Sequence, residues 1–225
     1  MKQQNTDENE IVNHIKSDKR MQISSQLLSM VKGFLDDEEG LALYRYAYDA
    51  ASHGPCLEIG SYCGKSAIYI GSACKARNSI LFSIDHHTGS EEQQPGETYF
   101  DPELFDKLTN RVDTFGSFRL TLKRAGLENA VVPMVCQSET AARAWDTPLS
   151  LVFIDGGHSY KAAYTDYDCW ARHLLPGGYL LIHDIFKNPD DGGQAPYQVY
   201  KEALSSGDFR ELSMIKTLGV LHKSV

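Results

Sequence analysis

The fold expected of this chain is decided by residues 56–70, which read CLEIGSYCGKSAIYI. The stretch opens with a mostly apolar run that stops at Gly60, as is typical of a short buried β-strand. From Ala67 onward, apolar residues return at helical spacing. Gly60 and Gly64 lie at the join, where glycines expose backbone N–H groups and let a ligand come close to the main chain. A strand that turns through glycines into a helix is typical of a nucleotide site.

Composition excludes several classes of protein. With 225 residues, the chain is long enough for one full core. Its net charge of −8 and pI near 5.4 argue against nucleic-acid binding through a general basic surface. The sequence has no run of about 18 apolar residues that would cross a membrane and no apolar signal core at its start. The five cysteines are scattered and odd in number, so we expect reduced cysteines in a cytoplasmic protein, with no disulfide frame or zinc site.

The rest of the chain alternates between strand-like and helix-like segments, with a polar arm expected over residues 1–20. Strands are predicted over residues 56–59, 79–85, 131–136, 150–154 and 179–182, and a closing β-hairpin over 209–223. Besides the helix that starts in the opening stretch, helices are predicted over residues 23–35, 38–51, 102–114, 116–125, 160–174 and 197–205. Because strands separated by helices pair in parallel through right-handed crossovers, the sequence predicts a doubly wound α/β sheet.

Polar side chains follow the carboxyl ends of these strands, which is where ligands bind in such sheets. They are Glu58, Asp85, Gln137-Ser138, Asp155 and His183-Asp184. Asp85 has the spacing of a carboxylate that accepts hydrogen bonds from both ribose hydroxyls, although an aspartate that caps a loop would look the same. His86, beside it, is equally compatible with a ligand contact and with an ordinary loop.

Two other nucleotide motifs fit the opening stretch less well. A phosphate-binding P-loop needs four residues between its glycines, and three separate Gly60 from Gly64. A dehydrogenase fingerprint needs a glycine where Tyr62 stands. A tight strand-to-helix turn that binds nothing is a further alternative.

Over roughly residues 50–225, the chain resembles the class I S-adenosylmethionine-dependent methyltransferases. The segments that carry the resemblance are residues 57–66, 154–160, 176–178 and 183–184. Residues 57–66 look especially like the first motif of catechol O-methyltransferase, and the others like a bacterial branch of small-molecule methyltransferases. The resemblance implies a Rossmann-like seven-stranded sheet of order 3-2-1-4-5-7-6, with strand 7 antiparallel. It also implies a division into residues 1–52, an N-terminal arm and helices that cover the site, and residues 53–225, the cofactor-binding domain.

The resemblance further implies which residues bind S-adenosylmethionine. They are Glu58, Gly60, Ser61, Tyr62, Gly64, Ser66, Asp85, His86, Gln137, Ser138 and Asp155. Gln137 stands where the family often has an acid against the adenine amino group, and its carbonyl oxygen would make that contact instead. Lys65 is expected to face solvent.

The reaction centre is expected over the fourth and fifth strands. Asp155 and Asp184 match the metal-binding acids of the catechol-type enzymes, and hard oxygen ligands suit Mg²⁺. The family's third ligand, an asparagine, is Ile185 here, so we expect His158 to complete the metal site, with His183 as the alternative. Asp155, His158 and His183 are the predicted catalytic residues, with a histidine as general base. The alternatives are a structural ion pair for His183-Asp184 and a capping role for His158.

These features predict transfer of a methyl group from S-adenosylmethionine to a hydroxyl oxygen of a small molecule, with the help of a divalent metal. The loops over residues 86–101 and 187–196 are candidates to close the site. No nucleic-acid or membrane partner is expected, and a homodimer is an option. The alternatives are an S-adenosylmethionine-binding protein with different or lost chemistry and an ATP-using enzyme of the P-loop type.

Overall fold

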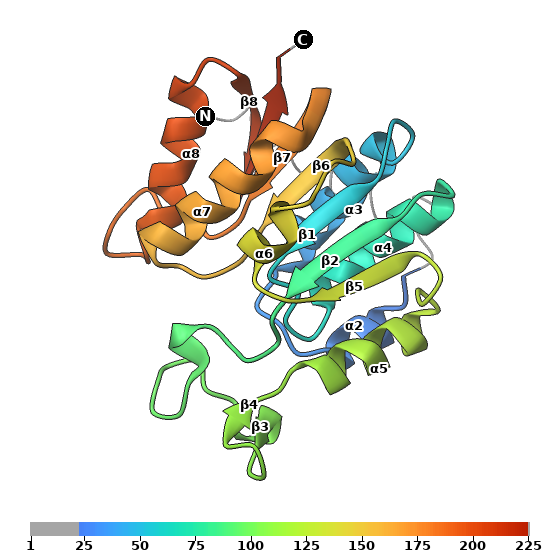
Figure 1. Ribbon diagram of the computed structural model, residues 1–225, viewed down its shortest axis with the longest axis vertical. Helices are drawn as coiled ribbons and strands as arrows, with labels where there is room; N and C mark the ends of the chain where they lie inside the picture. Colours follow the sequence, from blue (N-terminus) through green and yellow to red (C-terminus); the bar gives the residue numbers. More distant parts are fainter. Residues whose placement is uncertain (1–22, 225) are drawn as a thin grey trace, which may run out of the picture.

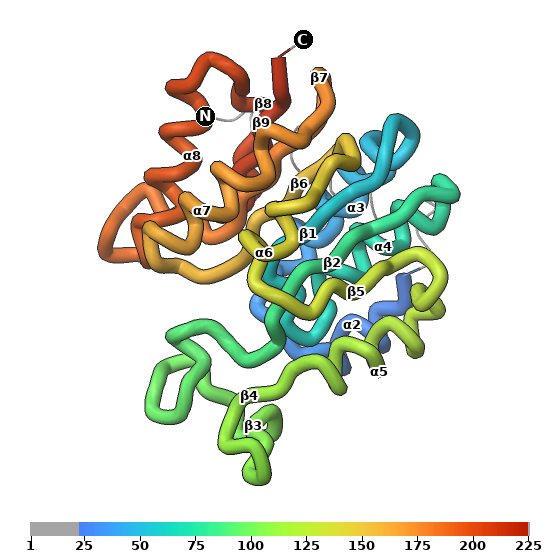
Figure 2. The backbone as a smooth tube through the Cα atoms, in the orientation of Figure 1, coloured from blue at the N-terminus to red at the C-terminus, as the bar shows by residue number. Residues whose placement is uncertain are grey.

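The computed structural model describes residues 23–224, so the predicted arm over residues 1–20 lies outside the described part (Figures 1 and 2). A seven-stranded sheet crosses the molecule in the order β5-β2-β1-β6-β7-β9-β8. Its strands are β1 (Cys56–Ile59), β2 (Leu81–Asp85), β5 (Val131–Val135), β6 (Leu149–Ile154), β7 (Leu174–Ile182), β8 (Phe209–Ile215) and β9 (Leu218–Lys223). The first five are parallel, and β9 is antiparallel to both β7 and β8. The predicted strand order and antiparallel last strand are confirmed.

The opening stretch lies at the centre of this sheet. Strand β1 pairs with β2 on one side and β6 on the other, and every residue of β1 and β6 is buried. A central parallel strand is covered on both faces, which is why β1 reads as a nearly continuous apolar run instead of an alternating one. Helix α4 (Lys65–Ala76) follows it directly, as predicted.

Helices cover both faces of the sheet (Figure 1). The core on one face includes residues of α3 (Asp37–Ala50), α4 and α5 (Phe115–Ala125). The core on the other includes residues of α6 (Ser138–Ala142), α7 (Tyr160–Trp170) and α8 (Ala195–Ser205). Leu43 and Ala47 of α3 are completely buried, and burial of a leucine side chain contributes roughly 1.5–3 kcal/mol. Helix α3 thus shares the core of the sheet, while the proposed division at residue 52 stays a prediction.

Two predicted helices are wrong. The pattern over residues 23–35 yields only the six-residue helix α2 (Ser25–Met30), after which Val31 is already extended. The pattern over 102–114 yields a 3₁₀ turn, Pro102–Leu104, and a hairpin of β3 (Phe105–Asp106) and β4 (Arg111–Val112). The Asp106 carboxylate explains the hairpin, because it accepts hydrogen bonds from the Leu108 N–H and the Thr109 hydroxyl. Such local bonds favour a turn over a helix.

Smaller differences concern element ends. Helix α7 stops at Trp170, where residues 171–173 form a 3₁₀ turn, and β7 starts at Leu174 instead of Tyr179. Helix α6 was not predicted. All five cysteines are free, as predicted. Within residues 23–224, no helix has the length and apolar character needed to cross a membrane.

Candidate active site

A cleft of about 720 Å³ opens over the carboxyl ends of the parallel strands, within the size range of small-molecule sites. Most residues predicted to bind or act on ligands line it. They are Gly60, Ser61, Tyr62, Ser66, Asp85, His86, Gln137, Ser138, Asp155, His158, His183 and Asp184. Glu58 and Gly64 do not line the cleft. The fold therefore brings together residues that lie more than 120 positions apart in the sequence.

The two glycines of the opening stretch are required by packing inside the protein. Gly60 has φ +89°, and a Cβ atom there would lie 2.0 Å from the main-chain oxygen of Asp155. Gly64 has φ +92°, and its Cβ atom would meet the side chains of Phe118 and Thr121 on α5 at 3.1 Å. Residues other than glycine rarely adopt such φ values. Both positions therefore favour glycine because of the main-chain conformation as well as the lack of room for a Cβ atom. At Gly60, the turn after β1 thereby contacts the main chain at the end of β6.

Glu58 lies behind the cleft. Its side chain is completely buried, and its Oε1 accepts a hydrogen bond of 2.6 Å from the Ser83 hydroxyl. Its Oε2 has no hydrogen-bond partner among the described residues. Burial raises the pKa of Glu58 to about 7, although the Ser83 and Ser66 hydroxyls oppose this. Glu58 therefore supports the turn from inside instead of facing a ligand.

The Asp85 carboxylate connects two turns at the floor of the cleft. Its Oδ2 accepts a hydrogen bond of 2.8 Å from the Tyr62 N–H, and its Oδ1 accepts one of 2.6 Å from the His87 N–H. Tyr62 and His87 both have positive φ, which is uncommon for residues other than glycine. The carboxylate stabilises both turns and still lines the cleft.

The segment before α3 lies along one side of the cleft. Lys65 was expected to face solvent, but its Nζ donates a hydrogen bond of 2.6 Å to the main-chain oxygen of Leu35. Lys32 forms ion pairs with Asp101 and Glu103, which raise its pKa although burial opposes this. The segment is thus attached to α4, to the last residue of the 86–101 loop and to the turn that follows it.

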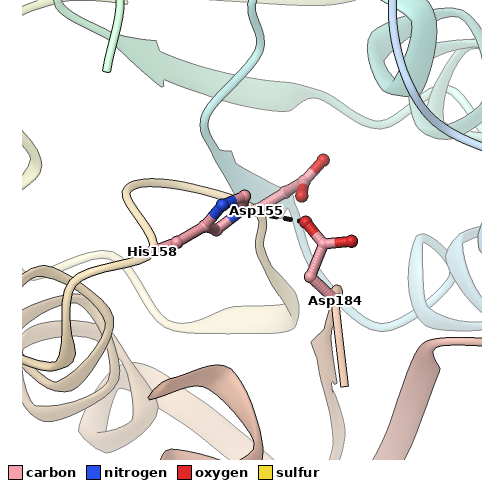
Figure 3. A group of neighbouring side chains, drawn as sticks. All are labelled: Asp155, His158 and Asp184. Atoms are coloured by element: carbon pink, nitrogen blue, oxygen red, sulfur yellow. Dashed lines mark ion pairs between the residues drawn. The ribbon is translucent and has the colours of Figure 1, made fainter. Parts of the chain in front are cut away.

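Asp155, His158 and Asp184 form a compact group at the ends of β6 and β7 (Figure 3). One ligand atom from each residue lies within 4.8 Å of the others. His158 Nε2 lies 2.8 Å from Asp184 Oδ2. Ile185 is buried and apolar and cannot serve as a ligand. Two carboxylates and one imidazole are a donor set that suits a divalent cation.

His183 lies beneath this group and has a different environment. It is only 5% exposed; its Nδ1 lies 2.9 Å from Asp155 Oδ1, and its Nε2 lies 3.0 Å from Glu39 Oε2. An ionised carboxylate only accepts hydrogen bonds, so with Asp155 and Glu39 ionised both ring nitrogens donate and the ring is an imidazolium. Burial opposes this charge, but Asp155 and Glu39 raise the pKa of His183 well above its usual value.

Glu39, at the start of α3, is a site residue that the sequence did not reveal. Its Oε1 accepts hydrogen bonds from the main-chain N–H of Thr217 at 2.8 Å and from the Thr217 hydroxyl at 2.7 Å. Burial acts to raise the pKa of Glu39, but His183 and Thr217 lower it to about 2. The sequence signal it carries is that of a helix cap, since Asp36 and Glu39 form a capping box.

Glu92 is the second site residue that the sequence did not reveal. It comes from the loop over residues 86–101, and its Oε2 lies 2.9 Å from His158 Nδ1. Asp184 and, to a smaller extent, Glu92 raise the pKa of His158 to about 9, although burial opposes them. The long loop thus reaches the reaction centre through one carboxylate.

The comparison with known families agrees with this geometry. A family model described as a methyltransferase domain matches residues 57–185, more than half of the chain. The chain belongs to this methyltransferase family. The matched region runs from β1 to the residue after Asp184, so it contains the cleft floor and the Asp155–His158–Asp184 group. The expected resemblance to methyltransferases is confirmed.

Solved structures share the fold at low sequence identity. The O-methyltransferase NovP is similar with a TM-score of 0.65 and 12% identity, over 84% of this chain and 80% of that one. TomG from Streptomyces achromogenes, an O-methyltransferase solved in complex with S-adenosylmethionine, has a TM-score of 0.62 and 14% identity, over 90% and 92% of the two chains. An O-methyltransferase from Bacillus cereus, solved with S-adenosylhomocysteine, has a TM-score of 0.62 and 12% identity, over 96% and 97%. At these identities the likeness shows the fold alone.

Proposed function

We propose that this protein transfers a methyl group from S-adenosylmethionine to a hydroxyl oxygen of a small molecule. The observation that carries the proposal is the Asp155–His158–Asp184 group, which lies in the wall of the cleft of a methyltransferase domain. An imidazole among carboxylates suits removal of a hydroxyl proton. The fold shared with O-methyltransferases supports this choice of acceptor atom.

The cleft fits S-adenosylmethionine, which supplies a methyl group already activated on a sulfonium. The Ser61 hydroxyl is buried and has no hydrogen-bond partner among the described residues, as expected of a group that meets a ligand. The turn over residues 60–62 would face the methionine part and Asp85 the ribose, with Gln137 and Ser138 toward the base. Ser66 and His86 also line the cleft, whereas Glu58 and Gly64 would act from behind.

A divalent cation fits the Asp155–His158–Asp184 group, and it would lower the pKa of a bound hydroxyl and fix its position. The imidazole nitrogen favours Mn²⁺ or Zn²⁺ somewhat more than Mg²⁺, which prefers oxygen ligands. Because metal ligands must be deprotonated, binding at this group would release the proton that His158 shares with Asp184.

We assign the two histidines different functions. The side chain of His158 is 33% exposed and lines the cleft. In the site without a cation, once the His158 ring has lost its proton, an acceptor hydroxyl that replaces Asp184 at Nε2 can give its own proton to that nitrogen, while Glu92 holds the other side of the ring. A cation bound at the same nitrogen would make His158 a ligand instead of the base. His183 has both nitrogens engaged and is buried, so it orients Asp155 instead of taking a proton.

Calorimetry with S-adenosylhomocysteine tests the cofactor, with micromolar affinity expected. Transfer of labelled methyl groups to a panel of hydroxylated compounds tests the reaction, with and without chelator. Binding without transfer to any compound would favour a binding protein with lost chemistry. Stabilisation against heat by ATP but not by S-adenosylhomocysteine would replace the proposal with an ATP-using enzyme.

We further infer a small-molecule acceptor and a cytoplasmic location, the latter from the five free cysteines. A homodimer stays a prediction, which light scattering of the purified full chain would test.

A further inference from the structure

The sheet order fixes which end of the cleft receives the base of the cofactor. Neighbouring strands are about 4.8 Å apart, and the order β5-β2-β1-β6-β7 places Asp85, at the end of β2, between the end of β5 and the reaction centre at β6 and β7. If Asp85 holds the ribose, the methionine part extends toward β6. The base must then lie on the other side of the ribose, near the residues that follow β5.

Asp166 on α7 lies at this end of the cleft. It is only 6% exposed, and it lines the cleft together with Ser138 and Glu139. Its Oδ1 accepts a hydrogen bond from the hydroxyl of Ser138, which is the first residue of α6, the helix that follows β5. This bond fixes the carboxylate next to the residues that follow β5, where the family resemblance places the base.

The second oxygen of Asp166 is free to accept a hydrogen bond. No hydrogen bond among residues 23–224 engages Oδ2, and this oxygen lies close to the turn after β6, where a Cβ atom on Gly156 would be 2.7 Å away. Oδ2 is not one of the fully enclosed polar atoms that lack a partner, so it is accessible from the cleft that Asp166 lines. Burial raises the pKa of Asp166 to about 6, although Ser138 opposes it, so the group is mostly ionised at pH 7.

We propose that Asp166 recognises the cofactor's adenine by accepting a hydrogen bond from its exocyclic amino group at Oδ2. This inference rests on the proposed function. The family resemblance places Gln137 in this role, but Gln137 is exposed, whereas the Asp166 carboxylate is held in position by Ser138. Asp166 lies eleven residues after Asp155 in the chain and reaches the base from the helix layer, so no pattern at the strand ends could reveal it. The carboxylate rejects a base with a 6-oxo group, because two acceptors would face each other.

The test compares two ligands of the same shape by calorimetry at pH 7.5. S-adenosylhomocysteine carries a 6-amino group, and S-inosylhomocysteine carries a 6-oxo group. The unaltered protein should prefer the first by about tenfold or more, the value of one hydrogen bond to a charged group. Asp166→Asn should weaken the binding of S-adenosylhomocysteine by about tenfold. It should strengthen the binding of S-inosylhomocysteine, because the asparagine amide can donate a hydrogen bond to the oxo group. Asp168→Asn, a change at an exposed aspartate of the same helix that lies outside the cleft lining, should leave the preference unchanged.

The outcomes separate this inference from the proposed function. If the unaltered protein binds neither ligand, the proposed function fails, and this inference fails with it. If it prefers S-adenosylhomocysteine and Asp166→Asn keeps that preference while Gln137→Ala loses it, only the inference on Asp166 is overturned. Should Asp166→Asn fail to fold, a crystal structure with S-adenosylhomocysteine decides, with the amino nitrogen expected within about 3.2 Å of Oδ2.

Discussion

The two ends of the cleft hold their groups in different ways. At the cofactor end, the Asp85 carboxylate accepts hydrogen bonds from two main-chain N–H groups, and Gly60 lets the main chain approach Asp155. At the reaction end, His158 and His183 are held by side chains from four different parts of the chain. These side chains are Glu39 of α3, Glu92 of the long loop, Asp155 after β6 and Asp184 after β7.

This difference has a consequence for charge. With both histidines protonated, four carboxylates face two imidazolium groups, so the reaction end keeps a net negative charge. A negative site favours a cation, whether a sulfonium or a metal ion. At the cofactor end one side chain, Asp85, holds the main chain, whereas at the reaction end side chains hold one another. Removal of Glu39 or Asp155 would therefore leave the buried His183 without a charged partner.

The largest effect is expected where the two ends meet. Gly60→Ala would force a Cβ atom to 2.0 Å from the Asp155 main-chain oxygen at a φ of +89°, so we expect a loss of about 4 kcal/mol or more in the free energy of unfolding. Urea unfolding followed by circular dichroism measures it. In Gly116→Ala, the matched control in α5, the new Cβ meets nothing within 4 Å, so stability should rise by up to about 1 kcal/mol. Equal stabilities for the two variants would contradict the packing reason for Gly60.

The next effect concerns the reaction end alone. His158→Gln should lower kcat by about 10²- to 10⁴-fold, the usual contribution of a general base, while the affinity for S-adenosylhomocysteine stays within about twofold. His53→Gln, a change at an exposed histidine, is the control. Methyl transfer to an acceptor found in the panel gives kcat, and calorimetry gives the affinity. An undiminished kcat would exclude His158 as the base.

The sequence reveals site residues that follow strand ends and misses those that reach the site from other parts of the chain. Gly60 and Asp85 belong to local patterns, because the constraint on each comes from the strand end on which it lies. Glu39 has no such pattern. It lies 144 positions from His183, and its local context indicates a helix cap. Contacts of this kind depend on how α3 packs, which strand and helix periodicities do not encode.

The same distinction explains why the helix predicted over residues 102–114 is wrong. Residues 56–70 form the predicted strand and helix because burial on the sheet fixes both periodicities. Near residues 102–114, the apolar spacing is compatible with a helix, but the hydrogen bonds of the Asp106 side chain favour a hairpin. Hydrogen bonds from a side chain to the nearby main chain compete with a helix, and they leave no trace in the apolar spacing from which the helix was predicted.

A smaller effect follows from the buried pair of Glu39 and His183. Glu39→Gln should cost about 3 kcal/mol of stability at pH 5.5, since the pKa of Glu39 in the folded state is about 2 against 4.5 for a free glutamate. The Glu39 contribution is present above pH 4.5 and is lost as pH falls toward 2. The pKa of His183 is raised in the folded state, so its stabilising contribution is present below pH 6.5. This contribution is lost as pH rises through the pKa of His183 in the folded state. Urea unfolding at pH 5.5 and pH 3 should therefore show the gap between variant and parent shrinking in acid. The exposed neighbour change Glu38→Gln should show no such pH-dependent gap.

The smallest effect is expected where the long loop reaches the reaction end. The side chain of Glu92 is 44% exposed, and exposed ion pairs contribute at most about 1 kcal/mol, so Glu92→Gln should leave the melting temperature nearly unchanged. The pKa of His158 should nevertheless fall below about 9, because one of the carboxylates that raise it is removed, and it should stay above 6.5 because Asp184 remains. Titration of the His158 ring by NMR measures this shift. Glu91→Gln, which alters the preceding residue of the same loop, should leave the pKa of His158 as it was. A shift of the same size in both variants would mean that the loop acts through its general charge and not through the Glu92 contact.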